Sequence, residues 1–202
     1  MEEAQVKHVL IIHGWRNSRA QDHWQRHLAT ALRKAGHNVH YPQLPDTESP
    51  NFADWAQVLI AELEMISASK RDGEEVVVLV HSLGCSTWLR LGVDGLLPIV
   101  PDRLLLVAPP DSSMLADVSS FIVESTELVK TALHASAKDI TLLGSDDDPW
   151  MPRGIQETHG NALGLEAQIF EGAKHLALGD GFGHWQGVID WVLEPTANLR
   201  IR

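Results

Sequence analysis

The stretch VVVLVHSLGC, residues 76–85, joins a run of five apolar residues directly to a histidine, a serine and a glycine. An uninterrupted apolar run of this length is typical of a strand that helices cover on both faces. Trp88, Leu89 and Gly92 follow at helical spacing. The stretch therefore predicts a buried strand, a sharp turn at Ser82 and a helix, which is the repeating unit of a parallel α/β sheet.

Five other short apolar runs lie between turn residues, and they span residues 8–14, 38–44, 103–110, 140–146 and 166–172. Segments with helical spacing separate several of them, notably 23–32 and 52–66. Alternating strands and helices predict a compact, doubly wound α/β fold with about six parallel strands. Residues 111–130 are expected to form a helix plus a loop. The whole segment between the fourth and fifth strands, residues 111–139, is too short for a large lid domain. We expect one domain over residues 1–202.

Composition narrows the classes of partner and compartment. The chain has 202 residues, 44% of them hydrophobic, and a net charge of −11. This acidic balance offers no basic field for nucleic acid or an anionic membrane. Cys85 is the only cysteine, and the N-terminal segment MEEAQVKHVLII is acidic with a short apolar run. We therefore expect a cytoplasmic protein that acts on a small molecule, while the sequence leaves its oligomeric state unknown.

Ser82 lies where a parallel sheet binds ligands, at the carboxyl end of a strand and the start of a helix. The pentapeptide Val80-His81-Ser82-Leu83-Gly84 resembles the nucleophile elbow G-x-S-x-G of α/β-hydrolases, with Val80 in place of the first glycine. Either the turn is wider than usual or the resemblance misleads. The alternative interpretation is a serine that only caps a helix.

A nucleophilic serine needs a histidine base and an acid that orients it. In α/β-hydrolases these follow in the order serine, acid, histidine, after late strands. Asp148 and His175 occupy these places, and the sequence Asp148-Pro149 resembles the acid loop of hydrolases. The alternatives for the acid are Asp111, after the fourth strand, and Asp146 and Asp147, which can instead belong to a solvated turn. The alternative for the base is His184, which is expected in the first turn of a final helix.

The same loops supply candidates for binding the substrate. Backbone N–H groups of Leu83 and Trp15 are expected to hold the oxyanion. Trp15, Trp150 and Trp185 flank the expected catalytic loops and suggest an aromatic pocket. His23 and His27, four residues apart, are interpreted as a surface pair because no HExxH pattern or third ligand accompanies them. The hypothesis requires no metal and no organic cofactor.

The motifs together resemble a family of small serine hydrolases that includes the retinoblastoma-binding serine hydrolase and its bacterial relatives. The motifs that carry this resemblance are IIHGW at 11–15, His23-Trp24, HSLG at 81–84, VAPPD at 107–111, SDDDPWMP at 145–152 and GAKHLALGDGFGHW at 172–185. The resemblance implies an α/β-hydrolase fold, with Ser82 as nucleophile, Asp148 as acid and His175 as base. It implies hydrolysis of small acyl esters, or of related thioesters or amides, through an acyl-enzyme.

Two other classes of function stay open at this point. A binding protein with a decayed hydrolase site is compatible with Val80. A nucleotide-binding domain is disfavoured, because the sequence has neither G-x-G-x-x-G after the first strand nor G-x-x-x-x-G-K-[ST].

Overall fold

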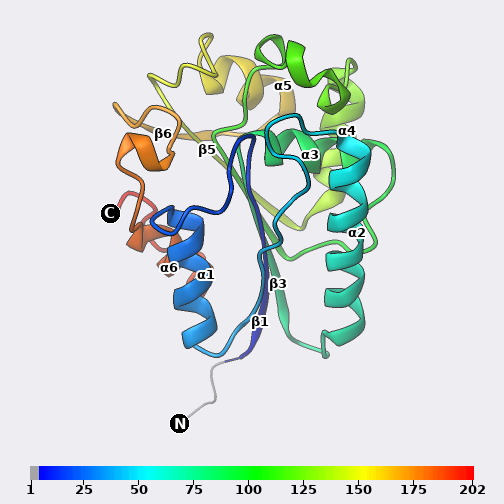
Figure 1. The fold of residues 1–202 in the computed structure, drawn as a ribbon, viewed down its shortest axis with the longest axis vertical. Helices are drawn as coiled ribbons and strands as arrows, with labels where there is room; N and C mark the ends of the chain where they lie inside the picture. The colour runs from blue at the N-terminus through cyan, green and yellow to red at the C-terminus, as the bar shows by residue number, and fades with distance from the viewer. Residues whose placement is uncertain (1–4) are drawn as a thin grey trace.

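The fold is built around a sheet of six parallel strands in the order β2-β1-β3-β4-β5-β6 (Figure 1). The computed structural model describes residues 5–202, so the first four residues of the expected domain and of the acidic N-terminal segment lie outside the described residues. The strands are β1 (Lys7–Ile12), β2 (Asn38–His40), β3 (Glu75–His81), β4 (Arg103–Val107), β5 (Asp139–Ser145) and β6 (Ala167–Phe170). The predicted parallel sheet, with all six strands, is confirmed.

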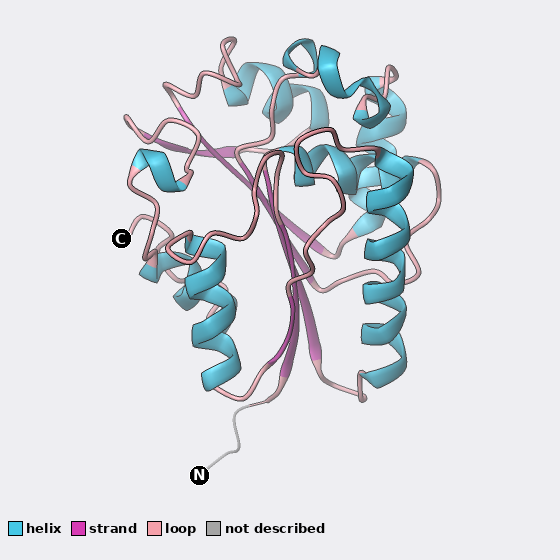
Figure 2. Ribbon diagram, viewed as in Figure 1, coloured by secondary structure: helices cyan, strands magenta, loops and turns pink. Residues whose placement is uncertain are grey.

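Helices cover both faces of this sheet (Figure 2). Helices α1 (Trp24–Lys34) and α6 (Gln186–Leu193) pack on one face, against residues such as Val77 and Leu79. Helices α2 (Phe52–Ser69), α3 (Leu83–Val93) and α4 (Thr126–Ser136) pack on the other face, against residues such as Val78 and Val80. Because successive side chains of a strand point to opposite faces, β3 is apolar at every position between its end residues, from Val76 to Val80.

The order of the strands places the chemistry between β1 and β3. The chain passes from β1 to β2 on one side and then crosses back to β3 on the other side of β1. At such a switch point the loops after the two strands diverge and leave a crevice at their carboxyl ends. The loop after β1 carries Trp15, and the turn after β3 carries Ser82.

Residues between β4 and β5 form short helices, as expected for a helix plus a loop. Two 3-10 helices, η1 (Ser112–Met114) and η2 (Ala116–Phe121), precede α4. Between β5 and β6 a π-helical turn, η3 (Gln156–Gly160), leads into α5 (Asn161–Leu163), and η4 (Leu178–Asp180) follows β6. No large lid is inserted among residues 5–202. Within this range, every helix is too short or too polar to cross a membrane.

Candidate active site

Ser82 occupies a strained turn between β3 and α3. Its backbone angles are φ 55° and ψ −125°, a combination that residues other than glycine rarely adopt. Strain of this kind costs on the order of 1–3 kcal/mol and persists only where the surrounding structure imposes it. Here the Ser82 N–H donates to Val107 O (3.0 Å), and Ser82 O accepts from Cys85 N–H (2.8 Å). The turn therefore links the sheet to the helix and exposes the hydroxyl between them.

Two glycines allow this turn to approach the loop after β1. A Cβ atom added to Gly14 would lie 2.7 Å from Ser82 Cβ, and one added to Gly84 would lie 2.9 Å from His13 O. Both distances are shorter than a real carbon contact. Positions 14 and 84 therefore have no room for a side chain and require glycine.

The glycine that is absent at position 80 is not needed in this turn. Val80 is fully buried in the core beneath α2 and α3. The nearby helix residue is the small Cys85, whose Sγ lies 3.5 Å from Val80 O. The sharp turn thus forms with valine in place of the first glycine of the motif.

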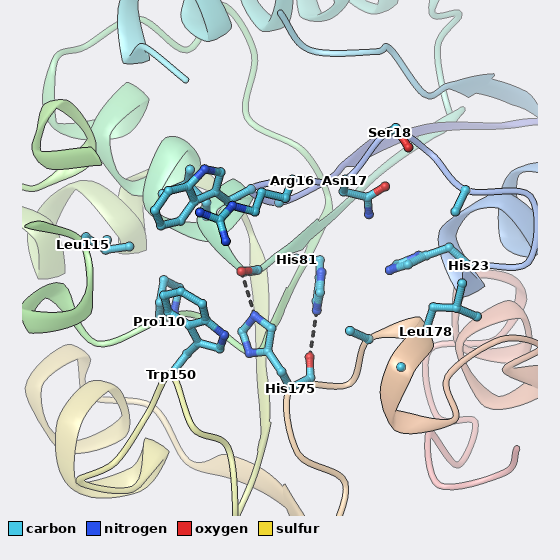
Figure 3. Close-up of a pocket in the computed structure, with 17 residues that line it drawn as sticks. Arg16, Asn17, Ser18, His23, His81, Pro110, Leu115, Trp150, His175 and Leu178 are labelled. Atoms are coloured by element: carbon cyan, nitrogen blue, oxygen red, sulfur yellow. Dashed lines mark hydrogen bonds between the residues drawn. The ribbon is translucent and has the colours of Figure 1, made fainter. Parts of the chain in front are cut away.

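Three polar side chains from distant parts of the chain meet beside this turn, and Figure 3 shows one of them, His175, at the cavity. The Ser82 hydroxyl lies 2.8 Å from His175 Nε2, and His175 Nδ1 lies 2.9 Å from Asp148 Oδ2 and 3.0 Å from Oδ1. Asp148 is almost completely buried, and its Oδ1 also accepts from the Trp150 N–H (2.9 Å). With Nδ1–H donating to the carboxylate, Nε2 is free to accept a proton from serine.

The loop that presents His175 is itself strained and is held by hydrogen bonds from other loops. Lys174 and Leu176, on either side of His175, have φ of 48° and 51°. Asp147 Oδ1 accepts from Lys174 N–H (2.7 Å), and Asp180 Oδ2 accepts from His175 N–H (3.2 Å). These acceptors fix the backbone on both sides of the imidazole.

His81 supplies a third support to this loop. Its Nε2–H donates to the backbone O of His175 at 2.9 Å, as the dashed line in Figure 3 shows. The imidazole is completely enclosed, and its Nδ1 atom has no hydrogen-bond partner among residues 5–202. Burial, together with the nearby His175 and His23, holds the pKa of His81 well below its usual value. His81 is therefore a neutral donor.

The other carboxylates considered for the acid role bond elsewhere. Asp146 Oδ1 accepts from Gly172 N–H (2.8 Å), and Asp147 takes part in the support of Lys174. As expected of a solvated turn, both residues are exposed in a turn after β5, and their side chains also join the acid loop to the loop that carries His175. Asp111 is buried, and Arg153 Nε donates to it at 2.7 Å. That hydrogen bond is the main cause that lowers the pKa of Asp111 to about 2.

Two expectations about histidines are wrong. His184 precedes α6 and its cap Trp185, so it does not belong to the first turn of that helix; it is exposed, with its ring 5.8 Å from that of His27. His23 is not on the surface, because it is buried and caps α1 by accepting the Gln25 N–H on Nδ1 (3.2 Å). An N-cap residue has an extended backbone and lies just outside the helix. The spacing of four residues between His23 and His27 does not show where the helix begins, so it does not identify His23 as the cap.

Ser82 and His175 open into a cavity of about 290 Å³. Trp15 and Trp150 line it, with their ring centroids 6.0 Å apart. Trp185, expected in the same wall, is instead buried in the core beside Trp24 (5.3 Å) and donates its indole N–H to Leu199 O (2.7 Å). The large apolar area of a tryptophan suits a core as well as a pocket. Trp185 is the N-cap residue of α6, which packs with α1 on the same face of the sheet.

The residues expected to bind the oxyanion lie at this cavity. Leu83 begins α3 directly after Ser82, so its amide belongs to the unpaired N–H groups of a helix N-terminus. Trp15 follows Gly14, and both line the cavity together with Ser82. Trp15 follows β1 and Leu83 follows β3, which are neighbouring strands of the sheet.

Buried histidines around the cavity are neutral. Burial lowers the pKa of both His13 and His23 to about 4. His13 Nε2 accepts from Leu44 N–H (3.0 Å), so its Nδ1 carries the proton and donates to Gly14 O (2.9 Å). This fixes the tautomer of His13 and anchors the loop next to Ser82.

Sequence reasoning missed the roles of His81 and His23 in the site. Both line the cavity, and His81 directly precedes Ser82 in the motif that the sequence singled out. A polar residue inside an otherwise apolar strand was the available signal for His81. Among residues 5–202 no cluster of histidine, cysteine, aspartate and glutamate is arranged to hold a metal ion.

Comparisons with known proteins show the family of the chain. The sequence matches the model of a family described as serine hydrolase over residues 9–194. No curated protein matches the sequence significantly.

Solved structures resemble the whole fold. The ydeN gene product of B. subtilis is 21% identical, with 93% of this chain and 97% of that chain covered and a TM-score of 0.72. A putative YdeN-like hydrolase from Pectobacterium atrosepticum is 19% identical over 94% and 90% of the two chains (TM-score 0.63). An esterase domain from Rhodothermus marinus is 17% identical over 91% and 84% (TM-score 0.61). The extent of the family match and the shared α/β-hydrolase fold lead to one conclusion: the chain belongs to the serine hydrolase family.

Proposed function

We propose that the protein is a carboxylesterase that cleaves esters of small acyl groups through a Ser82-His175-Asp148 triad. The observation that carries the proposal is the unbroken line of contacts from Ser82 Oγ to His175 Nε2 (2.8 Å) and from His175 Nδ1 to Asp148 (2.9 Å). These distances are within hydrogen-bonding reach for proton transfer. They join residues 93 and 27 positions apart in the chain, which only the fold brings together.

The first half of the reaction forms an acyl-enzyme. Ser82 Oγ attacks the ester carbonyl carbon while His175 Nε2 takes the hydroxyl proton, and Asp148 stabilises the resulting imidazolium. The Leu83 and Trp15 amides hold the oxyanion. His175 then gives the proton to the departing alkoxide oxygen, and the C–O bond breaks.

Water completes the cycle. His175 removes a proton from a water molecule, whose oxygen attacks the acyl carbon, and Ser82 leaves with the proton returned from His175. All proton transfers use the chain's own groups, so the proposed reaction needs no metal or organic cofactor. Thioesters and amides follow the same steps and differ in the leaving group.

The names of structural neighbours support an ester as substrate. The matched domain from Rhodothermus marinus is named an esterase, as is a Pyrococcus furiosus protein that is 16% identical with a TM-score of 0.57. The sequence resemblance to the retinoblastoma-binding branch of the family adds the motif GAKHLALGDGFGHW, which carries His175. We include membership of that branch in the proposal.

The test is hydrolysis of p-nitrophenyl acetate by wild type and by Ser82→Ala. The variant should lose at least about 1,000-fold in kcat, because the nucleophile acts as a unit with its base. Ser67→Ala, on the exposed face of α2, is the matched control and should keep the wild-type rate. Equal rates for wild type and Ser82→Ala would instead support a binding protein with a decayed site.

A further inference from the structure

His23 presents a hydrogen-bond donor to the cavity that holds Ser82. The residue is 6% exposed and is the N-cap of α1, where its Nδ1 accepts the Gln25 N–H at 3.2 Å. A neutral imidazole carries one N–H, so an accepting Nδ1 places the proton on Nε2. Among residues 5–202 this Nε2–H has no acceptor, and the His23 ring lies in the wall of the cavity. The N–H is therefore left for a molecule inside the cavity.

The position of this proton is fixed by the structure around the ring. Burial and, to a smaller extent, the nearby His13 lower the pKa of His23 to about 4, so the ring is neutral near pH 7. A flip of the ring would replace Nδ1 by a carbon atom and would remove the cap of α1. His23 thus offers an uncharged donor whose tautomer and direction are set before any ligand binds.

The neighbours of His23 in the cavity wall indicate which chemical group suits this donor. Asn17 donates its side-chain N–H to Gln25 Oε1 at 3.3 Å, and Ser18 is exposed to solvent. Leu178, beside His23 in Figure 3, is apolar. Leaving a donor unpaired in such partly apolar surroundings is costly when a ligand displaces water. An uncharged oxygen carried on carbon, as in an ether or a ketone, suits this place better than a charged group.

His23 is separated from the reacting groups by the ring of His81. The centroid of the His81 ring lies 5.8 Å from that of His23 and 5.2 Å from that of His175, and Figure 3 shows it between the two. The acceptor therefore belongs to a distant part of the substrate and not to the ester group. With bonds of about 1.5 Å, roughly five or six bonds are needed between the carbonyl carbon and the acceptor.

We propose that His23 selects substrates that carry an uncharged oxygen acceptor about five or six bonds from the ester carbonyl carbon. The inference rests on the proposed esterase function and adds a class of substrate to it. The acceptor can belong to the acyl chain or to the alcohol, since the same N–H serves both. Because this hydrogen bond is remote from the reacting atoms, it should act on KM more than on kcat.

The test compares kcat/KM for pairs of esters in which one ether oxygen replaces one methylene. The acyl arm uses phenyl ω-methoxypentanoate and phenyl heptanoate, and the alcohol arm uses ω-methoxybutyl acetate and hexyl acetate. His23→Asn keeps a cap for α1, but its shorter side chain does not extend into the cavity. In one arm the ratio of ether to alkyl ester should fall by about three- to tenfold, the usual effect of one hydrogen bond, mostly through KM. His184→Asn, an exposed histidine outside the cavity, should keep the wild-type ratio.

A second measurement tests the donor without turnover. In a proton–nitrogen correlation spectrum of Ser82→Ala at pH 7, His23 should be protonated on Nε2 only. The ether ester of the responding arm should shift the His23 Nε2 signal, and its alkyl counterpart should shift it less.

The outcomes separate the inference from the proposed function. Protonation of His23 on Nδ1, or equal ratios for folded His23→Asn and wild type in both arms, would overturn the inference while Ser82-dependent hydrolysis remained. Hydrolysis of phenyl heptanoate by Ser82→Ala at the wild-type rate would show instead that the proposed function fails. A ratio that falls in one arm, together with the shift of the Nε2 signal, supports the inference and shows which side of the ester carries the acceptor.

Discussion

The turn that carries Ser82 and the loop that carries His175 are joined by hydrogen bonds from Ser82 and His81 to His175, yet different forces hold them. The turn is fixed by close packing: Gly14 and Gly84 leave no room for a side chain, and His13 and His81 are buried beside it. The loop is fixed by its backbone hydrogen bonds: Asp147 and Asp180 accept from its N–H groups, and His81 donates to the backbone O of His175. The nucleophile therefore depends on burial, and the base depends on polar partners.

The largest expected effect is a decrease in the free energy of unfolding at low pH, caused by the buried histidines near Ser82. The pKa values of His13 and His23 are about 4 in the folded protein and near 6.5 when unfolded, and that of His81 is also lowered. Between these values the unfolded chain binds more protons, so the free energy of unfolding falls as pH decreases from 6.5 toward 4. The loss is up to about 1.4 kcal/mol per pH unit for each histidine. Urea denaturation at pH 7.5, 6.5, 5.5 and 4.5 measures it.

His23→Asn is the matched control for the pH effect. Asparagine retains the capability to cap α1 but does not titrate. Its free energy of unfolding should fall less steeply below pH 6.5 than that of wild type. A wild-type stability that stays constant from pH 6.5 to 4.5 would show that these histidines are not buried as the structure has them.

A smaller change in the free energy of unfolding is expected when a methyl group is added to the Ser82 turn or to the His175 loop. In Gly84→Ala the new Cβ meets His13 O at 2.9 Å and Ile12 O at 3.1 Å, which are backbone atoms. The free energy of unfolding should fall by about 1–3 kcal/mol, the usual cost of overpacking. Gly179→Ala, in the histidine loop, meets nothing within 4 Å and should change it by less than about 0.5 kcal/mol. Thermal denaturation of both variants checks the contrast, and equal losses would contradict it.

The smallest expected effect concerns how the base is positioned. His81→Leu removes the donor to His175 O and should lower kcat on p-nitrophenyl acetate by about 10- to 100-fold, since small displacements of a catalytic group have effects of this size. KM should change little. His81→Gln can present an N–H near the same place and should recover part of kcat. If both variants lose kcat equally and in step with their melting temperature, His81 serves folding alone.

Much of the fold followed from local patterns in the sequence. The continuous apolar runs gave the strands, because a parallel sheet with helices on both faces needs apolar residues at every strand position. Ser82, Asp148 and His175 follow β3, β5 and β6, and the carboxyl ends of parallel strands lie at one edge of the sheet. Their proximity was therefore predictable from topology.

The features that the sequence did not reveal depend on tertiary packing. Trp185 and His23 are residues whose chemistry suits either a core or a surface, so only the position of their helices decides their burial. Asp147 and Asp180 support a loop through backbone N–H groups, and such groups carry no sequence signature.

The central claim is that Ser82 is the activated nucleophile, and covalent labelling tests it most directly. Folded protein treated with a fluorophosphonate and digested for mass spectrometry should carry one adduct, on the peptide that contains Ser82. Ser82→Ala should carry none, and His175→Ala should label far more slowly because its serine has lost the base 2.8 Å away. An unlabelled folded wild type, or an adduct on another serine that persists in Ser82→Ala, would contradict the account.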